Sequence, residues 1–324
     1  MNSDMPELPG KIQIGIYDGY CNLKCPMCLL HSPEVKANIG NLRGKMSLMD
    51  LCRILDEVKE GKPPITPHRW SEPLVNKKFS AYVKAIKQHG LPVYVNTNGL
   101  LLTKELAVFF VEIQLDSITF SIDALTPETL RLFRGTNDLD GIKSSVFMML
   151  RARGAAEYPR IGVSFTLGEA NRHEKDEFVN YWLEYVDVVR IIKLYEKDRS
   201  VRNIALPEKR GPCADIYNTM IIDYKGDVSI CCLDALSQTN MGNVLRQGVK
   251  KVWHGEAFAQ VRHYHETGQY DKLPLCKDCV PLSHFSYRET IAGDILTCQS
   301  PVMTFYNRLD RLDTWQERSV IESD

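Results

Sequence analysis

The sequence lacks a long apolar run, an excess of one charge and an internal repeat, and each absence removes a class of function. No stretch approaches the roughly 18 apolar residues that cross a bilayer as a helix. The formal net charge is −1, which gives no general electrostatic reason to expect nucleic acid or an anionic membrane as a partner. Residues 1–10 carry Asp4 and Glu7 and have no apolar core of a signal peptide. We therefore expect a cytoplasmic protein.

Cysteine is the residue type that needs an explanation. The chain has 324 residues, 44% of them hydrophobic, which is enough for one large domain and a smaller one. Its ten cysteines are not expected to form a disulfide framework in a reducing compartment. Three lie between positions 21 and 28 and five between 213 and 279, and this clustering indicates metal binding. Cys52 and Cys298 stand apart, and we interpret Cys52 as a core residue.

Strand and helix patterns alternate over the first two thirds of the chain. Predicted strands cover Lys11–Tyr17, Leu91–Asn96, Ser117–Ile122, Ile161–Leu167 and Val188–Leu194. Predicted helices cover Ser47–Glu60, Lys77–Gln88, Thr103–Phe110, Pro127–Phe133, Ile142–Arg153 and Lys175–Tyr185. This order predicts about six parallel βα units between Lys11 and Tyr195, an α/β fold that suits a partial (β/α)6 barrel. Reactive groups in such folds lie at the carboxyl ends of the strands.

The pattern changes after about Ile204. The segments Thr219–Asp223 and Asp227–Cys231 predict a hairpin, and a helix is expected over about Val249–His265. A C-terminal helix is expected over Val302–Trp315. We therefore divide the chain into a barrel domain (1–205), a small metal-binding domain (206–285) and a C-terminal extension (286–324).

The first cysteine group has the spacing C-x3-C-x2-C, made by Cys21, Cys25 and Cys28. Three thiolates on one tight loop bind three irons of a 4Fe–4S cube and leave the fourth iron open to a small molecule. A structural zinc site needs four ligands, and only His31 is near. Zinc remains the alternative on spacing alone.

This cysteine loop resembles the signature of the radical S-adenosylmethionine (SAM) superfamily, because it directly follows the first predicted strand. Downstream segments strengthen the resemblance. Trp70-Ser71-Glu72-Pro73 is similar to the family's Gly-Gly-Glu-Pro element, with Trp70 and Ser71 in place of the glycines. Val95–Gly99 resembles the end of the family's third strand, and Ser121–Ala124 with Arg134 resembles the residues that hold the SAM ribose and carboxylate.

The resemblance implies cofactors, a reaction type and a set of site residues. It implies a 4Fe–4S cluster whose open iron is chelated by SAM, a 5′-deoxyadenosyl radical that abstracts hydrogen, and an electron donor such as flavodoxin or ferredoxin. Glu72 is expected to pair with the SAM ammonium, and Met27 to pack near the adenine. The full implied set of SAM-binding residues is Met27, Ser71, Glu72, Asn98, Ser121, Asp123 and Arg134.

The second cysteine group contains four candidate ligands, Cys213, Cys231, Cys276 and Cys279. Taken alone, these four fit zinc or a 4Fe–4S cluster equally well. The series Gly226–Cys232, Met241–Val244, Val252-Trp253 and Leu275–Cys279 resembles the C-terminal SPASM extension of radical SAM enzymes. Only Cys298 follows, so the shortened "twitch" form with one auxiliary cluster fits better. The spacing resembles that of aminocyclitol dehydrogenases.

Cys232 lies beside a candidate ligand and has three interpretations. It is a small residue of a strand, or it replaces Cys231 as the ligand, or it donates a hydrogen atom to a substrate radical, as a cysteine does in radical SAM epimerases.

Four functions follow from these observations. The first is oxidation of an alcohol to a ketone on an amino sugar, aminocyclitol or glycoside, with the auxiliary cluster as electron acceptor. The second is epimerisation with Cys232 as hydrogen donor. The third is modification of a ribosomal peptide, which is less expected because only ten residues precede the first strand. The fourth, a non-catalytic zinc protein, leaves the SAM-binding segments unexplained.

Overall fold

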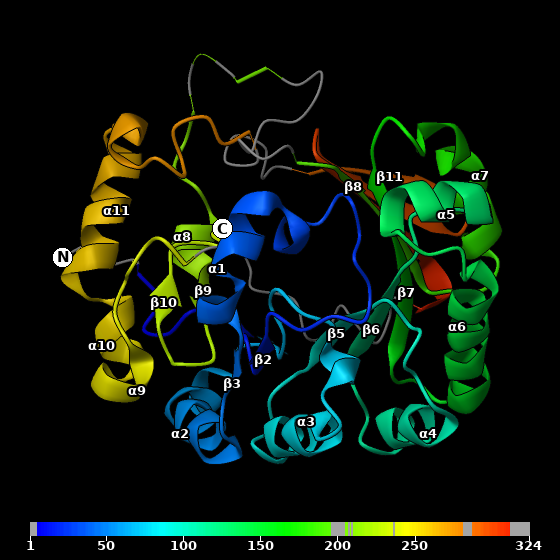
Figure 1. Ribbon diagram of the computed structural model, residues 1–324, viewed down its shortest axis with the longest axis horizontal. Coiled ribbons are helices and arrows are strands. Elements are labelled where there is room, and N and C mark those ends of the chain that lie inside the picture. Colours follow the sequence, from blue (N-terminus) through cyan, green and yellow to red (C-terminus); the bar gives the residue numbers. More distant parts are fainter. Residues whose placement is uncertain are drawn as a thin grey trace. The chain divides into compact units, whose positions relative to one another are not determined.

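The computed structural model describes residues 5–195, 205, 206, 208, 210–235, 237–280 and 287–311, without the side chains of residues 34 and 38–41. The chain forms two compact units, and each takes two separate stretches of sequence (Figure 1). Unit 1 combines Met1–Thr97 with Tyr195–Phe285, and unit 2 combines Asn98–Leu194 with Ser286–Asp324. The division into domains 1–205, 206–285 and 286–324 stays a prediction.

Unit 1 is organised around β1. This strand pairs in parallel with β4 on one side and β9 on the other, with Ile12 opposite both Ile65 and Met220. A strand with neighbours on both sides buries its apolar side chains, and Ile12 and Ile14 are fully buried. The strands of unit 1 are β1 (Lys11–Ile14), β2 (Tyr17–Asp18), β3 (Gly44–Lys45), β4 (Ile65–Thr66), β5 (Tyr94–Thr97), β9 (Thr219–Ile222) and β10 (Val228–Ser229).

The helices of unit 1 join its two stretches of sequence. Ser47 caps α2 by accepting a hydrogen bond from the Asp50 amide, as predicted. Helix α2 also binds the start of a helix from the second stretch, because Glu57 Oε2 accepts a hydrogen bond from the Val249 amide at 2.6 Å. The helices are α1 (Pro33–Leu42), α2 (Leu48–Val58), α3 (Phe79–Gln88), α8 (Asp215–Asn218), α9 (Val244–Gln247), α10 (Val249–Trp253) and α11 (Glu256–Glu266).

The predicted hairpin is confirmed, and two other expectations for unit 1 need correction. Strands β9 and β10 pair antiparallel around a turn in which Gly226 has φ of +83°. The single helix expected over Val249–His265 is wrong, because the chain breaks at His254 and Gly255 caps a new helix, α11. Strand β4 lies between prolines, in a segment for which the sequence predicted no strand, and it forms because Ile65 donates its amide to Pro92 O.

Unit 2 has a sheet in the order β11-β12-β13-β8-β7-β6. Strands β6, β7 and β8 are parallel, which confirms the α/β class. The last three strands are antiparallel to one another, and β13 is antiparallel to β8. The elements are β6 (Ser117–Ser121), β7 (Arg160–Leu167), β8 (Val188–Lys193), β11 (Arg288–Ala292), β12 (Ile295–Gln299), β13 (Met303–Arg308), α4 (Lys104–Glu112), α5 (Pro127–Arg134), α6 (Leu139–Arg153) and α7 (Lys175–Leu183).

The C-terminal helix expected over Val302–Trp315 is wrong where the structure describes it. Met303–Arg308 forms β13, whose Phe305 lies opposite Arg190 of β8. The backbone of β8 would otherwise be an open sheet edge, and pairing with it outweighs the helical pattern of the segment. Residues 312–315 of the expected helix lie outside the described residues.

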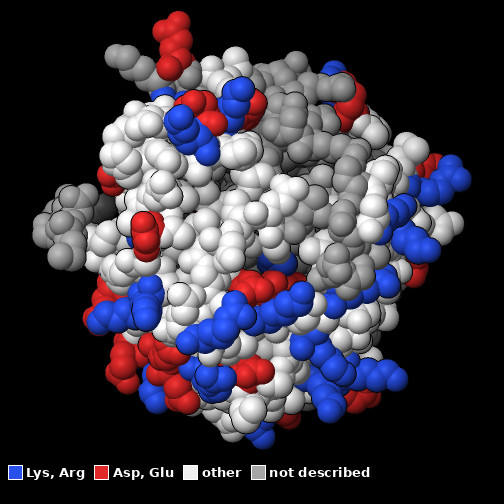
Figure 2. Space-filling model, turned by 60° about the vertical axis from the view of Figure 1, so that its left-hand side comes forward, with Lys and Arg blue, Asp and Glu red and all other residues white. Residues whose placement is uncertain are grey.

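In the part of the chain that the structure describes, no helix combines the length and the apolar character that crossing a membrane requires. Lysine and arginine side chains are interspersed with aspartate and glutamate on the face that Figure 2 shows, in keeping with the formal net charge of −1.

Candidate functional site

The three cysteines of the first group lie on one turn-rich loop after β2. Hydrogen bonds from the Cys28 amide to Cys25 O and from the His31 amide to Cys28 O fold the loop back on itself. The Leu23 amide donates to Cys21 Sγ at 3.4 Å. Cys21 and Cys28 pack beside the side chains of Leu42 and Trp70, so the loop has an apolar backing that keeps water from one side.

Electrostatics indicate that these thiols need a cation. Burial, together with nearby Glu72, Cys25 and Cys28, raises the pKa of the Cys21 thiol to about 12. A thiolate is the metal-binding form, and bound iron supplies the positive charge that makes it stable at neutral pH. The same contacts place the Glu72 carboxylate within electrostatic reach of the candidate cluster ligands.

Glu72 is held in one orientation beside this loop. Its Oε1 accepts hydrogen bonds from the Leu74 amide at 3.1 Å and from Thr97 Oγ1 at 2.7 Å, and the residue is buried. Two neighbours on the same segment, Trp70 Nε1 and Ser71 Oγ, are buried and have no hydrogen-bond partner among the described residues. A fixed carboxylate flanked by two unsatisfied donors fits a small polar cofactor with an ammonium group, as the resemblance implies for SAM.

Asp123 and Arg134 form a buried ion pair in unit 2, at the carboxyl end of β6. Arg134 donates from Nε at 2.6 Å and from Nη2 at 2.5 Å to Asp123 Oδ2. Asp123 is fully buried with φ of +68°, and its Oδ1 accepts from the Thr166 amide at 2.5 Å. Asn171 Nδ2 then bonds the Asp123 and Thr166 carbonyls, both at 2.9 Å. Arg134 is thus oriented by Asp123.

The other predicted SAM-binding residues occupy less constrained positions. Ser121 ends β6 and its hydroxyl accepts from Ser164 Oγ at 3.3 Å. Asn98 is buried, and its Oδ1 accepts from the Leu100 amide at 3.1 Å, which forms a turn after β5. Met27 is half-buried on the cysteine loop. Met27, Ser71 and Glu72 belong to unit 1, whereas Asn98, Ser121, Asp123 and Arg134 belong to unit 2.

The four cysteines of the second group come together in unit 1. Cys276 is part of a buried cluster with Ile216, Ile230, Val261 and Leu275, against which Cys213 and Cys231 pack. Burial, followed by nearby acidic and thiol groups that include Cys276 and Cys279, raises the pKa of both the Cys213 and the Cys231 thiols. The Cys213 amide also donates to Nδ1 of buried His265 at 3.2 Å, which fixes the backbone of that ligand candidate.

Among the described residues, no three His, Cys, Asp or Glu side chains converge tightly enough to hold one metal ion. The cysteines of a 4Fe–4S cube each bind a different iron, whereas the four ligands of a zinc ion share one metal.

Cys232 lies next to Cys231 and is exposed to solvent. Crowding by the protein around it, with Asp215 next in effect, raises the pKa of its thiol to about 11, and Lys11 and Cys279 are also near. The group is therefore a protonated thiol at neutral pH, the form that donates a hydrogen atom. Of these neighbours, Cys279 belongs to the auxiliary group, and none lies on the Cys21–Cys28 loop.

Several residues of the site escaped the sequence interpretation. Thr97 and Asn171 orient predicted site residues, and Asp18 pairs with Arg69 at 3.5 Å, where both side chains are buried. Arg69 had a local signal, because it directly precedes Trp70-Ser71-Glu72. Asn171 had none, since it is 48 residues from Asp123 in the chain and only the pairing of β6 with β7 brings it near.

Comparison with known proteins identifies two family domains in the chain. The radical SAM superfamily matches residues 18–168. The SPASM family, described as an iron-sulfur cluster-binding domain, matches residues 213–280. These two domains bring with them SAM and two iron–sulfur clusters, one catalytic and one auxiliary.

Relatives and solved structures agree with this assignment. A Pyrococcus furiosus protein named "Tungsten-containing aldehyde ferredoxin oxidoreductase cofactor-modifying protein" is 28% identical over 181 residues, which are 54% of this chain and 49% of the relative. The chain spans about half the length of the curated relatives it matches.

Two solved structures share the fold at low identity. BtrN in complex with AdoMet and 2-DOIA is 18% identical, with a TM-score of 0.57 over 85% of this chain and 94% of BtrN. Streptococcus suis SuiB bound to its precursor peptide SuiA is 15% identical, with a TM-score of 0.64 over 80% of this chain and 68% of SuiB.

Proposed function

Because this chain is a radical SAM family enzyme with a C-terminal SPASM domain, we propose that it oxidises an alcohol of a small polar substrate to a ketone. The substrate class is an amino sugar, an aminocyclitol or a glycoside. The substrate carbon would lose a hydrogen atom to the SAM-derived radical and its hydroxyl would lose a proton to a base. An auxiliary cluster held by Cys213, Cys231, Cys276 and Cys279 would accept the remaining electron. The substrate loses two hydrogens in total, which is the difference in composition between an alcohol and its ketone.

The observation that carries the proposal is the complete four-cysteine set. Cys213, Cys231, Cys276 and Cys279 gather around one buried apolar cluster. A cluster with four protein ligands has no open iron for a substrate, so its remaining role is electron transfer. Electron acceptance is the step that an alcohol oxidation needs after hydrogen abstraction.

The residues of this chain would have the following roles in the reaction. Cys21, Cys25 and Cys28 would hold the catalytic cluster, which together with SAM supplies the hydrogen-abstracting radical. Glu72, fixed by Thr97 and the Leu74 amide, would pair with the SAM ammonium. Ser121, Asp123 and Arg134 remain the proposed contacts of the ribose and carboxylate, with Arg134 positioned by Asp123. A flavodoxin or ferredoxin would supply the electron.

Fold likeness supports a small substrate. BtrN, whose structure holds AdoMet together with 2-DOIA, is covered over 94% of its length, so few of its elements lack a counterpart here. This supports a catalytic chamber of similar size rather than a particular substrate.

Epimerisation is the second candidate, and Cys232 is the residue that favours it. Its thiol is protonated and exposed, as a hydrogen donor must be. Its charged and thiol neighbours Lys11, Asp215 and Cys279 lie on β1, on α8 and in the auxiliary cysteine group, however, and none of these three belongs to the Cys21–Cys28 loop. We therefore rank it below oxidation.

Peptide modification is the third candidate. SuiB was solved with a precursor peptide, and its TM-score of 0.64 exceeds that of BtrN. At 15% identity this likeness concerns the fold, so it keeps peptides within the substrate search without naming one.

The test is an anaerobic assay of the reconstituted enzyme in deuterated water with SAM, a reductant and a panel of aminocyclitols and amino sugars. Oxidation predicts a product lighter by two hydrogen atoms, with one SAM consumed per product and the same activity in Cys232→Ala. A product of unchanged formula that carries deuterium, lost in Cys232→Ala, would replace oxidation with epimerisation. No 5′-deoxyadenosine above background with any sugar would contradict the small-substrate proposal.

A further inference from the structure

Unit 1 contains a polar pocket of about 250 Å³ that none of the assigned residues explains. It lies where the end of α1, the segment that follows β4 and the β9–β10 hairpin meet. Leu42, Arg69, Asp223, Asp227, Ser237 and Asn240 are among its lining residues. Leu42 also packs in the apolar cluster that contains Cys21, Cys28 and Trp70. The pocket therefore adjoins the backing of the cysteine loop.

Arg69 forms the buried end of the pocket. Its side chain is 3% exposed and pairs with Asp18, which is 2% exposed, at 3.5 Å. Both terminal nitrogens of Arg69 donate to Ser237 Oγ at 3.1 Å. Arg69 Nε is buried and has no hydrogen-bond partner among the described residues. A buried donor without a partner is costly, so this end of the pocket has an unsatisfied polar group beside the Asp18 carboxylate.

Asp18 reaches Arg69 only because of a glycine. A Cβ at Gly15 would lie 2.0 Å from Asp18 Oδ2, so any other residue would push the carboxylate away. The Asp18 charge compensates Arg69, and the buried end of the pocket is thus close to neutral. A phosphate or sulfate ester would meet little net positive charge there.

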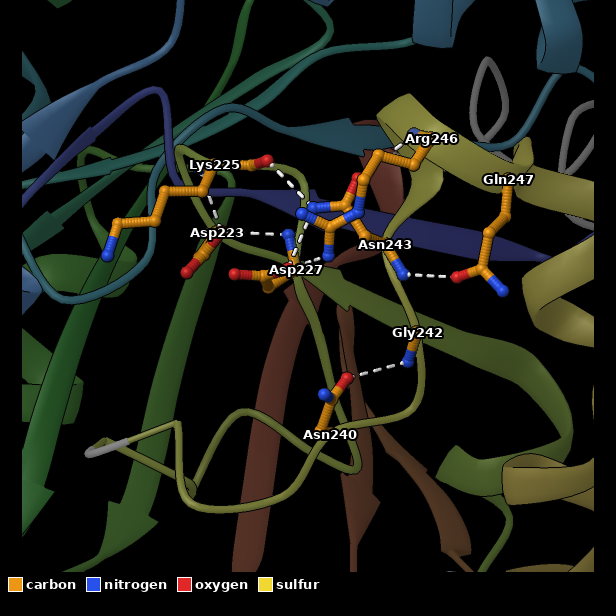
Figure 3. Close-up of polar contacts among 8 residues, drawn as sticks. All are labelled: Asp223, Lys225, Asp227, Asn240, Gly242, Asn243, Arg246 and Gln247. Atoms are coloured by element: carbon orange, nitrogen blue, oxygen red, sulfur yellow. Dashed lines mark hydrogen bonds and ion pairs between the residues drawn. The ribbon is translucent and has the colours of Figure 1, made fainter.

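The opposite wall presents carboxylates in fixed positions. Asp223 Oδ1 accepts from the backbone amides of Lys225 at 2.8 Å and Asp227 at 2.9 Å, as Figure 3 shows. Both of these bonds use Oδ1, which leaves Oδ2 for another donor. Asp227 Oδ1 accepts from Asn243 Nδ2 at 2.7 Å, and Arg246 Nη2 lies 3.4 Å away. The hairpin turn is therefore rigid before any ligand binds.

The chemistry of the walls selects the ligand class. Acceptors come from Asp223 and Asp227, donors from Arg69 and the Asn240 amide, and groups that do both from Ser237. Hydroxyl groups both donate and accept hydrogen bonds, so a ring that carries several of them can pair with the donors and the acceptors that line the pocket. An ammonium beside Asp223 adds a charge-assisted hydrogen bond. An apolar ligand would leave these groups unpaired, and the lining has no excess of positive charge for an anion, because Asp223 and Asp227 balance Arg69 and Lys225. The volume is below that of a drug-sized site and matches one small ring.

We propose that this pocket binds a hydroxyl-rich, amine-bearing ring of monosaccharide or cyclitol size, with Asp223 and Arg69 as the recognising residues. This inference rests on the proposed function, because it assigns to that reaction the site at which its substrate is recognised. Asp223 Oδ2 takes the ammonium or a ring hydroxyl, and the Arg69 guanidinium donates to a ring oxygen.

The test is isothermal titration calorimetry of the reconstituted enzyme with SAM, under anaerobic conditions, with glucosamine and myo-inositol as probes and inorganic phosphate as the anionic comparison. We expect binding of a ring probe and about 10–100-fold weaker binding in Asp223→Asn, the loss of one hydrogen bond to a charged group. Asp140→Asn, the same change at an exposed position outside unit 1, should leave binding unchanged. Asn240→Ala is the second variant if Asp223→Asn loses its iron.

The outcomes separate this site from the proposed reaction. If Asp223→Asn weakens ring binding and no oxidised product forms, the pocket is supported and the proposed oxidation is contradicted. An oxidised product whose KM is the same in Asp223→Asn, or no heat with either ring in iron-loaded enzyme, overturns the pocket. Phosphate binding that Asp223→Asn strengthens also overturns it, because the site would then select anions.

Discussion

The two cysteine groups of unit 1 are built in opposite ways. Cys21, Cys25 and Cys28 lie on one short loop, and backbone hydrogen bonds within that loop bring them together. Cys213, Cys231, Cys276 and Cys279 come from the approach to α8, the end of the hairpin and a distant turn, and a buried apolar cluster gathers them. The first site is local and provides three ligands, whereas the second is assembled by the fold and provides four.

This difference matches the chemistry that each cluster performs. A local loop leaves one iron open, and the open iron can accept SAM. A site closed by the fold protects its cluster and leaves electron transfer as its role. The comparison also predicts different costs of mutation, since a change in the local loop leaves the buried cluster of Ile216, Ile230, Val261 and Leu275 intact and a change at Cys276 does not.

The largest effect is expected when the local site is broken. Cys25→Ala should remove the catalytic cluster, so iron falls from about eight to about four atoms per chain, with four irons in each cluster. Formation of 5′-deoxyadenosine should fall by at least about 100-fold, because about 3 kcal/mol of transition-state stabilisation already corresponds to that factor. Cys52→Ala, a half-buried cysteine of α2, is the matched control and should keep both values. Equal losses in the two variants would contradict the assignment.

Breaking the assembled site should give a different pattern. Cys276→Ala should also halve the iron content, yet it should keep SAM cleavage without substrate, because the first loop is intact. Substrate oxidation should be lost, and thermal stability should drop because Cys276 is a buried core residue. Cys298→Ala, on the β12 hairpin strand, serves as the control for this group. A loss of iron in Cys298→Ala would mean that Cys298 is a ligand.

A third prediction extends the comparison to unit 2, whose Asp123 site is also assembled by the fold. Asp123→Asn leaves buried Arg134 without its charge partner and should lower the free energy of unfolding by about 3–5 kcal/mol. Glu169→Gln, which breaks the exposed pair with Arg172, should cost less than about 1 kcal/mol. Urea titration of both variants measures the difference. Equal costs would show that the Asp123 pair adds no more than a surface contact.

The smallest effect concerns the pH dependence of Asp18. Burial raises its pKa from 3.8 to about 6, with Asp223 adding to the rise and Arg69 opposing it. The folded state therefore binds this proton more tightly, and the stability it contributes is present below about pH 4 and lost as the pH rises through about 6. Relative to Asp18→Asn, the wild type should lose at most about 3 kcal/mol between these limits. If urea titrations show that the stabilities of the wild type and of Asp18→Asn change in parallel across this pH range, the prediction is contradicted.

Local signals in the sequence predicted local structure. The cysteine loop and the hairpin turn each depend on residues within a few positions of one another, and the structure contains both of these elements. Non-local structure was missed. The sequence of the β13 segment predicts a helix, but the segment forms a strand because it pairs with β8. Strand β4 forms between prolines because β1 and the residue after Pro92 pair with it.

The candidate site follows the same rule. The cysteines and Glu72 lie in recognisable motifs, so the sequence alone named them. Thr97, Asn171 and the Asp18–Arg69 pair act through contacts between segments far apart in the chain. Thr97 and Arg69 lie in or beside recognisable segments that give no sign of these contacts, and no motif marks Asn171. Gly15 has a role only because Asp18 approaches its backbone, which no spacing rule contains.

The most direct test of the account is electron paramagnetic resonance of the reduced, reconstituted enzyme with and without SAM, in two triple variants. In Cys213→Ala/Cys276→Ala/Cys279→Ala, only the first cluster remains, and SAM should change its spectrum by binding the open iron. In Cys21→Ala/Cys25→Ala/Cys28→Ala, the auxiliary cluster should remain and its spectrum should not respond to SAM. A SAM response from the second variant, or none from the first, would contradict the assignment of one open and one closed cluster.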